Sequence, residues 1–301
     1  MASGLFHKLD EDAVLIAAHA RQAEQFRLAH AHWKKQQGIK AWPSPAIYSW
    51  NEWLKRMGEN LLWSGYSGKQ GVRSLLTPLQ EQTVWEQVIR ADINNPLLHL
   101  SSTAASARQA WAMIQAWRMP DPKAAQFPSE DVKAFNRWVA NYYKRCKNAA
   151  WLDQARLPDT LKRAIKLGNV ALPNELIFAG FIQFTPQQIE LITAIREKNT
   201  QINLYKPTEV NASVNGKKFD STQQEFQSIA KWCREKLEKN ADARIAVAVP
   251  GLSGLRSKLD KVLRKSLYPS SFHSEQEFIN PAYQFSTGES LADSSIAQMA
   301  M

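Results

Sequence analysis

The feature that most constrains the fold is a set of short apolar runs, each followed by a helical pattern. AVLIAA (13–18) precedes a helix pattern over about 20–37, which ends at Gly38, a residue type common just beyond helix ends. LIFAGF (176–181) is followed by the Thr-Pro-Gln-Gln sequence at 185–188, a helix-start signal. Buried strands of parallel sheets read as continuous apolar runs. The chain is therefore predicted to form an α/β fold.

Two further segments complete the predicted sheet. PAIYSW (45–50) and QINLYK (201–206) have the residue types of strands. Ser49 and Glu52 form a capping box for a helix that presents Trp50, Trp53, Leu54 and Met57 on one face. We expect residues 58–76, with four glycines and little periodicity, to be a loop.

A long all-helical stretch, at about 77–168, interrupts the strands. The sequence predicts a helix that starts at Thr77, a second over about 101–118 and a third over about 130–148. Their tryptophans recur at helical spacing, which favours packing over base stacking. We interpret this stretch as a helical insertion in the α/β domain.

The chain is predicted to have two domains, residues 1–206 and 217–301, joined by a polar linker over 207–216. In the second, Thr222 and Glu225 cap a helix, ARIAVAVP (243–250) reads as a fully buried strand, and a basic helix spans 253–267. YQFSTG follows, and a helical pattern continues to residue 301. We expect this to be the start of a second α/β lobe, in a piece of a longer protein.

Composition narrows the class of protein. The 301 residues are 44% hydrophobic, too apolar for a disordered chain, and the apolar runs are too short to cross a bilayer. The N-terminus lacks the basic and apolar regions of a signal peptide. Cys146 and Cys233 lie on apolar helix stripes without metal-ligand spacing, so we expect buried thiols in a reducing compartment. These features predict a cytoplasmic location and no membrane partner.

The net charge is +10, and its distribution is uneven. Residues 132–167 hold nine basic and two acidic residues. A second concentration lies on the helix predicted at 253–267. Its members are Arg256, Lys258, Lys261, Arg264 and Lys265. These could be solvated helix faces or surfaces that bind a phosphate backbone.

The chemistry of a nucleotide-driven motor is absent from the sequence. A P-loop requires G-x-x-x-x-G-K-[ST] after its first strand, whereas this chain has the glycine-free sequence HARQA (19–23) there. The strand at 176–181 ends in Ala179 and Gly180, where a motor would carry acids that hold magnesium. GYSGKQG (65–71) lacks the Ser or Thr after Lys69. We therefore expect no bound cofactor.

Other catalytic sets are also missing. His30 and His32 point in different directions on a helix, so we expect solvated histidines rather than a metal site. The closest match to a PD-(D/E)xK nuclease motif, EDVK (130–133), opens a predicted helix, where acids complement the helix dipole. We expect this segment not to be an enzyme.

The order of the motifs resembles a known family. AVLIAAHARQAEQF, AWPSPAIYSWNEWL, LQEQTVWEQVI, AWAMIQAW, FNRWVANYYKRC, LIFAGFIQFTPQQIELI, ARIAVAVPGLSGLR and YQFSTGESLA occur in an order similar to the N-terminal part of AddB-like bacterial DNA repair proteins. In that family an inactivated superfamily 1 helicase region precedes a nuclease domain of the RecB exonuclease type. The resemblance covers almost the whole chain.

The resemblance implies a P-loop helicase-like parallel sheet with a helical insertion, serving as a scaffold in DNA recombination and repair. It implies that Gly180 and Phe181 match the Gly-Phe at the end of the Walker B-like strand, and that Arg21 lies where active relatives contact single-stranded DNA. The implied partners are single-stranded or tailed duplex DNA, a helicase-nuclease subunit and a C-terminal nuclease domain of the same chain. Together with the basic regions, the DNA-binding candidates are Arg21, Lys144, Arg145, Arg256, Lys258, Lys261 and Arg264. The alternative is a protein-interaction module that does not bind DNA.

Overall fold

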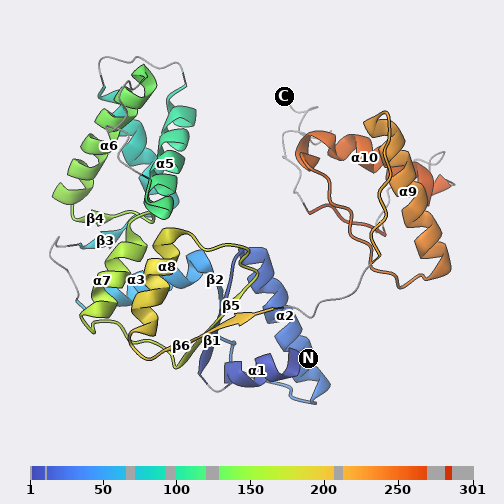
Figure 1. Ribbon diagram of the computed structural model, residues 1–301, viewed down its shortest axis with the longest axis horizontal. Coiled ribbons are helices and arrows are strands. Elements are labelled where there is room, and N and C mark those ends of the chain that lie inside the picture. Colours follow the sequence, from blue (N-terminus) through green and yellow to red (C-terminus); the bar gives the residue numbers. More distant parts are fainter. Residues whose placement is uncertain are drawn as a thin grey trace. The chain divides into compact units, whose positions relative to one another are not determined.

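The computed structural model describes residues 2–10, 12–65, 72–92, 99–119, 129–206, 213–269 and 282–286 (Figure 1). The chain divides into two compact units, Met1–Glu209 and Val210–Met301. Each unit has hydrophobic clusters of its own. They are therefore described one at a time.

The centre of the first unit is a four-stranded parallel sheet. Its strands are β1 (Ala13–Ala17), β2 (Ile47–Ser49), β5 (Glu175–Ala179) and β6 (Gln201–Tyr205), in the order β2-β1-β5-β6. Leu15 of β1 is in register with Ile47 on one side and Ile177 on the other. The predicted α/β class with a parallel sheet is confirmed, and all four strands lie in predicted segments.

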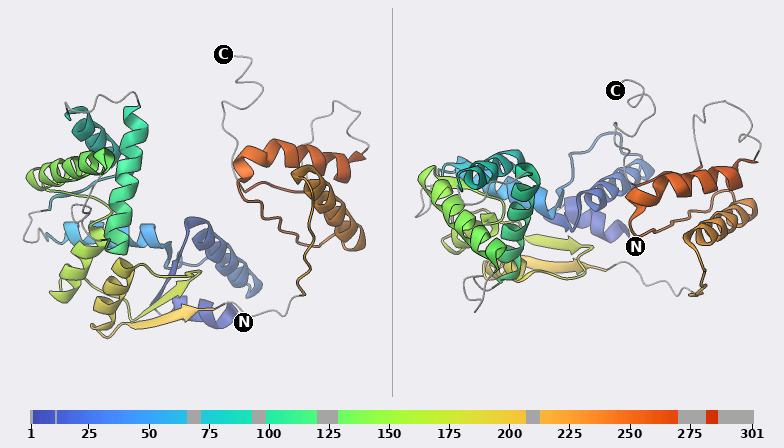
Figure 2. Two further views of the ribbon diagram at one scale, coloured as in Figure 1. Left: turned by 45° about the horizontal axis from the view of Figure 1, so that its top comes forward. Right: turned by 90° about the horizontal axis from the view of Figure 1, so that it is seen from above.

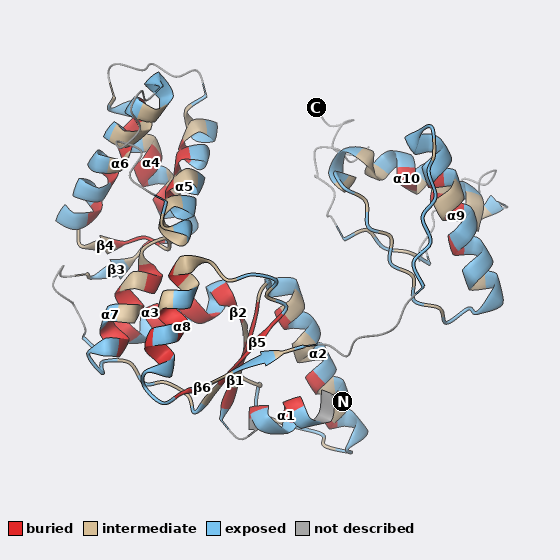
Figure 3. Cartoon of the chain, viewed as in Figure 1, coloured by how far each residue is buried: buried red, intermediate tan, exposed pale blue. Residues whose placement is uncertain are grey.

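Helices cover both faces of the sheet (Figure 1). On one face, α1 (Ala2–Asp10) and α2 (Ala20–Gln36) enclose a cluster with Phe6, Leu15 and Ile177. On the other face, α3 (Trp50–Trp63), α7 (Leu157–Lys166) and α8 (Pro186–Arg196) pack over Ile16, Leu176 and Phe178. Buried residues line the inner sides of these helices (Figure 3). Because β1 and β5 are covered on both faces, their sequences are apolar except for Glu175, the first residue of β5.

The helix starts predicted at Ser49, Thr77 and Thr185 are confirmed. At Ser49 the backbone N–H donates to Glu52 Oε2 at 2.7 Å, and the Ser49 hydroxyl accepts from the Glu52 N–H at 3.3 Å. Thr77 with Gln80 and Thr185 with Gln188 form the same reciprocal pairs. Each box satisfies two backbone donors that a helix start would otherwise leave unpaired.

The helical insertion follows α3. It contains β3 (Ser74–Leu75), α4 (Pro78–Arg90), α5 (Leu100–Trp117), α6 (Glu130–Asn148) and β4 (Trp151–Leu152), with β3 and β4 pairing in parallel. Its helices enclose a separate core, in which Trp85 is fully buried and stacks on Tyr142 with ring centroids 4.2 Å apart. Trp111 and Trp138 are also buried there, so the predicted packing role is confirmed for Trp85, Trp111 and Trp138. It is wrong for Trp117, which is 44% exposed at the end of α5.

The loop predicted over 58–76 is wrong at both ends. Helix α3 continues through Gly58 to Trp63, and Ser74 and Leu75 form β3. A Cβ added at Gly58 would lie 2.8 Å from Leu157 Cδ1, so the glycine allows α7 to pack closely against α3. The close contact with α7 explains a glycine that the sequence pattern alone assigned to a loop.

Arg118 connects the insertion to the α/β layer. It ends α5 in a left-handed conformation, with φ of 52°. Its guanidinium donates to Asp159 on α7 and to Glu190 on α8, with Nη1 to Asp159 Oδ2 at 3.0 Å and Nη2 to Glu190 Oε2 at 2.7 Å. Hydrogen bonds from Arg118 and Lys162, together with the positive charges of these two side chains, hold the pKa of the Glu190 carboxyl well below its usual range.

Replacing Arg118 with methionine should therefore loosen this junction. Charge-assisted hydrogen bonds contribute roughly 1.5–3 kcal/mol, so we expect the free energy of unfolding to fall by about 2 kcal/mol. Arg163→Met is the control, since Arg163 is exposed and its side chain donates a 3.3 Å hydrogen bond to the Thr160 hydroxyl, with no acidic partner among the described residues. Urea denaturation should show the loss in the Arg118 variant alone. Equal losses in both variants would contradict the junction role.

The second unit contains two packed helices. Helices α9 (Thr222–Lys239) and α10 (Leu252–Leu267) bury Phe226, Ala230, Leu259 and Leu263. The cap of α9 is one residue earlier than predicted, because the Ser221 side chain accepts from the Gln224 N–H. Gly251, in a left-handed conformation, precedes α10.

The buried strand predicted at 243–250 is wrong. These residues form no strand, and half-buried and exposed residues alternate along them. Ile245, Ala246 and Val247 border a pocket that residues of α9 and α10 also line, and Ala246 and Ala248 are exposed. The part of this unit that the structure describes contains no strand, so the predicted α/β lobe is not seen there. The helical pattern predicted beyond residue 286 lies outside the described residues.

Two other expectations can be compared with the structure. Cys146 and Cys233 are buried free thiols, as predicted, and burial raises the pKa of both. Within the described ranges, no helix combines the length and the apolar character needed to cross a bilayer.

Candidate nucleic-acid interface

The carboxyl edge of the sheet is the first place to look for a ligand. From β1 the chain passes through α2 to β2 on one side, whereas β5 lies on the other side of β1 and leads through α8 to β6. In open parallel sheets such a reversal of strand order leaves a crevice at the carboxyl ends, where ligands bind. Here that point lies between the ends of β1 and β5.

This point is filled by protein. The Ala18 N–H donates to the Ala179 carbonyl at 3.0 Å, which joins the ends of the two strands. Gly180 follows with φ of +74°, and a Cβ added to it would lie 2.0 Å from Gln22 Oε1. The side-chain amide of Gln22 therefore lies directly against the Gly180 backbone, in the place where a phosphate-binding loop would need open space.

Aromatic rings fill the neighbouring part of this edge. Phe181 stacks on Phe184 with centroids 4.7 Å apart, and both meet Phe178 at 5.6 Å. Trp50, at the start of α3, contacts Phe181 at 6.2 Å. The two residues that the resemblance matched to a Walker B-like strand end, Gly180 and Phe181, are thus packing residues.

Arg21 is exposed in the first turn of α2, at the same edge. Its position fits a surface contact. It lies on α2, whereas the other candidate cations lie on α6 and α10.

Four of the five basic residues of α6 lie on one side of the helix. Lys133, Arg137, Lys144 and Lys147 are separated by 4, 7 and 3 positions, spacings that return to one helical face. Trp138, Tyr142 and Cys146 face the core instead. We call Lys133, Arg137, Lys144, Arg145 and Lys147 the α6 basic row, since Arg145 lies beside its C-terminal end.

The two halves of the row differ in their partners. Lys133 Nζ lies 2.7 Å from Glu130, and Arg137 Nη2 lies 3.0 Å from Asp92. Lys144, Arg145 and Lys147 are exposed, and none of them has a side-chain partner among the described residues. The C-terminal half therefore presents uncompensated positive charge to solvent, which attracts a polyanion without the cost of breaking an ion pair.

The candidates on α10 fall into two groups. Arg256 lies over the Phe285 ring at 4.8 Å, and Arg264 Nε lies 2.7 Å from Asp260, so both help to pack the second unit. Lys258 and Lys261 are exposed, and with Lys265 they lie on the side away from Leu259. The five cations predicted as one set are therefore not equivalent.

The remaining sequence candidates can be placed as follows. The prediction of a solvated His30 is wrong, because it is 1% exposed and packs against Phe6 and Trp33. His32 is exposed.

The EDVK segment does open α6, where the Ser129 side chain accepts from the Val132 N–H. Lys69 lies outside the described residues. The described part of the chain contains no group of three or more His, Cys, Asp or Glu residues that could hold a metal ion.

Two features were not predicted from the sequence. Trp63 is 89% exposed at the end of α3, close in the chain to Arg73 on the other side of residues 66–71. The carboxylates of Glu81 on α4 and of Asp153, directly after β4, are both buried. Exposure of a tryptophan and burial of a carboxylate are set by tertiary packing, and no local pattern marks them.

Comparisons with known proteins add no family. No protein-family model matches the sequence, and none of the curated proteins compared with it is similar enough to match.

Proposed function

We propose that this chain is a non-catalytic, DNA-binding scaffold of a bacterial DNA repair or recombination nuclease, with a P-loop helicase-like core that does not bind nucleotide. The observation that carries the proposal is the C-terminal half of the α6 basic row. Lys144, Arg145 and Lys147 are exposed within one helical turn and have no acidic partner among the described residues. Phosphate groups of DNA are suitable partners for such a surface.

The filled carboxyl edge supports a scaffold rather than a motor. A motor needs backbone amides around the phosphates and a carboxylate for magnesium. At the matching places Gln22 lies against Gly180, and aromatic rings follow β5. In the AddB-like reading, the sheet keeps its position in the fold while the motor chemistry is lost. ATP hydrolysis by the purified chain would contradict this proposal.

The proposed partners follow from the same reading. DNA in single-stranded or tailed duplex form would lie along the α6 basic row, and Arg21, Lys258 and Lys261 would add contacts at other exposed positions. A helicase-nuclease subunit and a nuclease domain in the continuation of the chain would then act on the strand that this region holds. We propose a cytoplasmic location for this assembly.

A charge-reversal variant tests the proposal. In Lys144→Glu/Arg145→Glu/Lys147→Glu, each lost phosphate contact should lower the salt dependence of binding by about 0.9 in log-log slope. We expect the affinity for labelled single-stranded and tailed DNA to fall at least about tenfold at low salt, measured by fluorescence anisotropy at two salt concentrations. Lys35→Glu/Lys40→Glu/Lys198→Glu has the same net charge and is the control. If both variants lose affinity equally, the interface is not at α6.

A second candidate function is protein interaction without DNA binding. It is favoured by three exposed aliphatic side chains, Ile182 at 104%, Ile189 at 53% and Leu204 at 58% relative exposure. Exposed apolar side chains that form one contiguous patch mark protein contacts. Absence of DNA binding at low salt by the unmodified chain would favour this candidate.

A further inference from the structure

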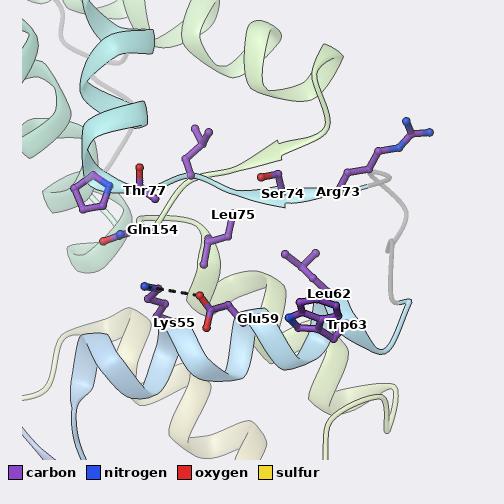
Figure 4. Close-up of a pocket in the computed structure, with 11 residues that line it drawn as sticks. Lys55, Glu59, Leu62, Trp63, Arg73, Ser74, Leu75, Thr77 and Gln154 are labelled. Carbon is purple, nitrogen blue, oxygen red and sulfur yellow. Dashed lines mark ion pairs between the residues drawn. The ribbon is translucent and has the colours of Figure 1, made fainter.

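A groove runs between α3 and β3 in the first unit (Figure 4). Its volume is about 480 Å³. Lys55, Glu59 and Trp63 of α3 and Arg73, just before β3, are among the residues that line it. Helix α3 supplies one wall, and β3 with the start of α4 supplies the other.

Trp63 is the unusual residue of this groove. It is 89% exposed, whereas Trp85, Trp111 and Trp138 in the nearby insertion are 0%, 9% and 7% exposed. A tryptophan exposed to this degree contributes little to the core, since burial of apolar area is what stabilises the fold. Both faces of an exposed indole are suited to stacking on a flat aromatic ligand, such as a nucleobase.

The charged residues of the groove are mainly cations. Arg73 is exposed and has no side-chain partner among the described residues. Lys55 lies 3.8 Å from Glu59, the acidic residue of the lining, and both side chains are about half exposed or more, at 61% and 49%. Such an exposed pair is weak, so Lys55 can exchange Glu59 for another anion.

Backbone hydrogen bonds join Arg73, which lines the groove, to the C-terminal end of α6. The Arg73 N–H donates to the Ala150 carbonyl at 2.8 Å, and the Ala150 N–H donates to the Lys147 carbonyl at 3.2 Å. Arg73 therefore lies beside the C-terminal end of α6, where Lys144, Arg145 and Lys147 are exposed. The groove and the cations at the C-terminal end of α6 are therefore neighbours in the first unit.

We propose that this groove binds single-stranded DNA, with one base stacked on Trp63 and the adjoining phosphates on Arg73 and Lys55. This inference rests on the proposed DNA-binding function and adds a site for bases to it. Stacking requires an unpaired base, because the faces of bases in a duplex are already covered. The groove therefore gives a preference for single strands with little dependence on sequence.

The test compares two probes of equal charge. Fluorescence anisotropy is measured with a labelled oligothymidine and with an abasic oligonucleotide of the same length. Loss of one stacked base costs roughly 1–3 kcal/mol, so Trp63→Ala should bind oligothymidine about tenfold more weakly and the abasic strand unchanged. Trp63→Phe should restore part of the affinity, because phenylalanine keeps an aromatic face.

A matched control is available in the other unit. Trp232 is 47% exposed on α9, and Trp232→Ala should bind both probes like the unmodified chain. If Trp63→Ala binds oligothymidine normally, or loses affinity for both probes alike, the stacking site is overturned while the proposed function stands. If the unmodified chain binds no DNA at low salt, the proposed function fails and this inference fails with it.

Discussion

Replacing Glu81 with glutamine is expected to remove most of the pH dependence of stability between pH 5 and pH 8. Glu81 is 5% exposed in α4 and accepts a 2.6 Å hydrogen bond from the Gln154 N–H. Burial and the neighbouring Asp153 raise its pKa to about 7, against the opposing effects of that hydrogen bond, Arg108 and Arg156. The carboxyl group therefore titrates near neutral pH in the folded chain.

The sign follows from the two pKa values. In the unfolded chain the group titrates near 4.5, so between 4.5 and 7 the folded state binds a proton that the unfolded state lacks. The stabilisation is complete below about pH 4.5 and is lost as the pH rises through 7. At about 1.4 kcal/mol per pKa unit, the free energy of unfolding should fall by about 3 kcal/mol from pH 5 to pH 8.

Urea denaturation at pH 5 and pH 8 measures this difference. Glu81→Gln should be nearly constant over the range and more stable than the unmodified chain at pH 8, because its amide oxygen can still accept from the Gln154 N–H. Glu81→Ala is the control, since it leaves that buried N–H unpaired and should be less stable at both pH values. An unchanged pH dependence in Glu81→Gln would assign the titration to another group.

The elements predicted correctly are those specified by local signals. The runs at 13–18 and 176–181 are apolar because helices cover both faces of β1 and β5. Such runs can be recognised in the sequence without knowing which helices cover them. Ser49 and Thr185 each cap a helix by a reciprocal pair of hydrogen bonds with the residue three positions later. Such a capping box is also a local signal. The sheet class and the helix starts could therefore be predicted from the sequence.

The errors arise where distant parts of the chain decide the outcome. Gly58 reads as a loop residue, yet it lies in a helix because Leu157, almost a hundred positions later, packs on it. Ala243–Val249 has strand-like residues, but a strand also needs a hydrogen-bonding neighbour, and the described residues provide none. Arg256 and Arg264 read as surface cations, although Phe285 and Asp260 engage them. Within the described residues, only Lys258 and Lys261 of the α10 candidates are therefore exposed, unpaired cations of the kind that the sequence predicted.

Replacing Trp85 with alanine is expected to unfold the helical insertion before the α/β layer. Trp85 is fully buried between Tyr142 at 4.2 Å and Phe135 at 6.5 Å, so the substitution leaves a large cavity in the core of the insertion. Such substitutions cost about 3–5 kcal/mol. The sheet has its own clusters, which do not include Trp85. The loss of stability should therefore concentrate in α4, α5 and α6.

Hydrogen exchange measured by mass spectrometry separates these regions. In Trp85→Ala, exchange should accelerate across α4–α6 while β1 and β5 stay protected, and DNA affinity should fall because α6 carries the basic row. Trp85→Phe is the matched control: it keeps an aromatic ring beside Tyr142 and removes an indole N–H that has no hydrogen-bond partner among the described residues. It should cost about 1 kcal/mol and leave DNA binding intact. Equal acceleration of exchange in β1 and β5 would show that the insertion and the sheet unfold as one cooperative unit. If the variant binds DNA normally although α6 exchanges rapidly, α6 is not part of the interface.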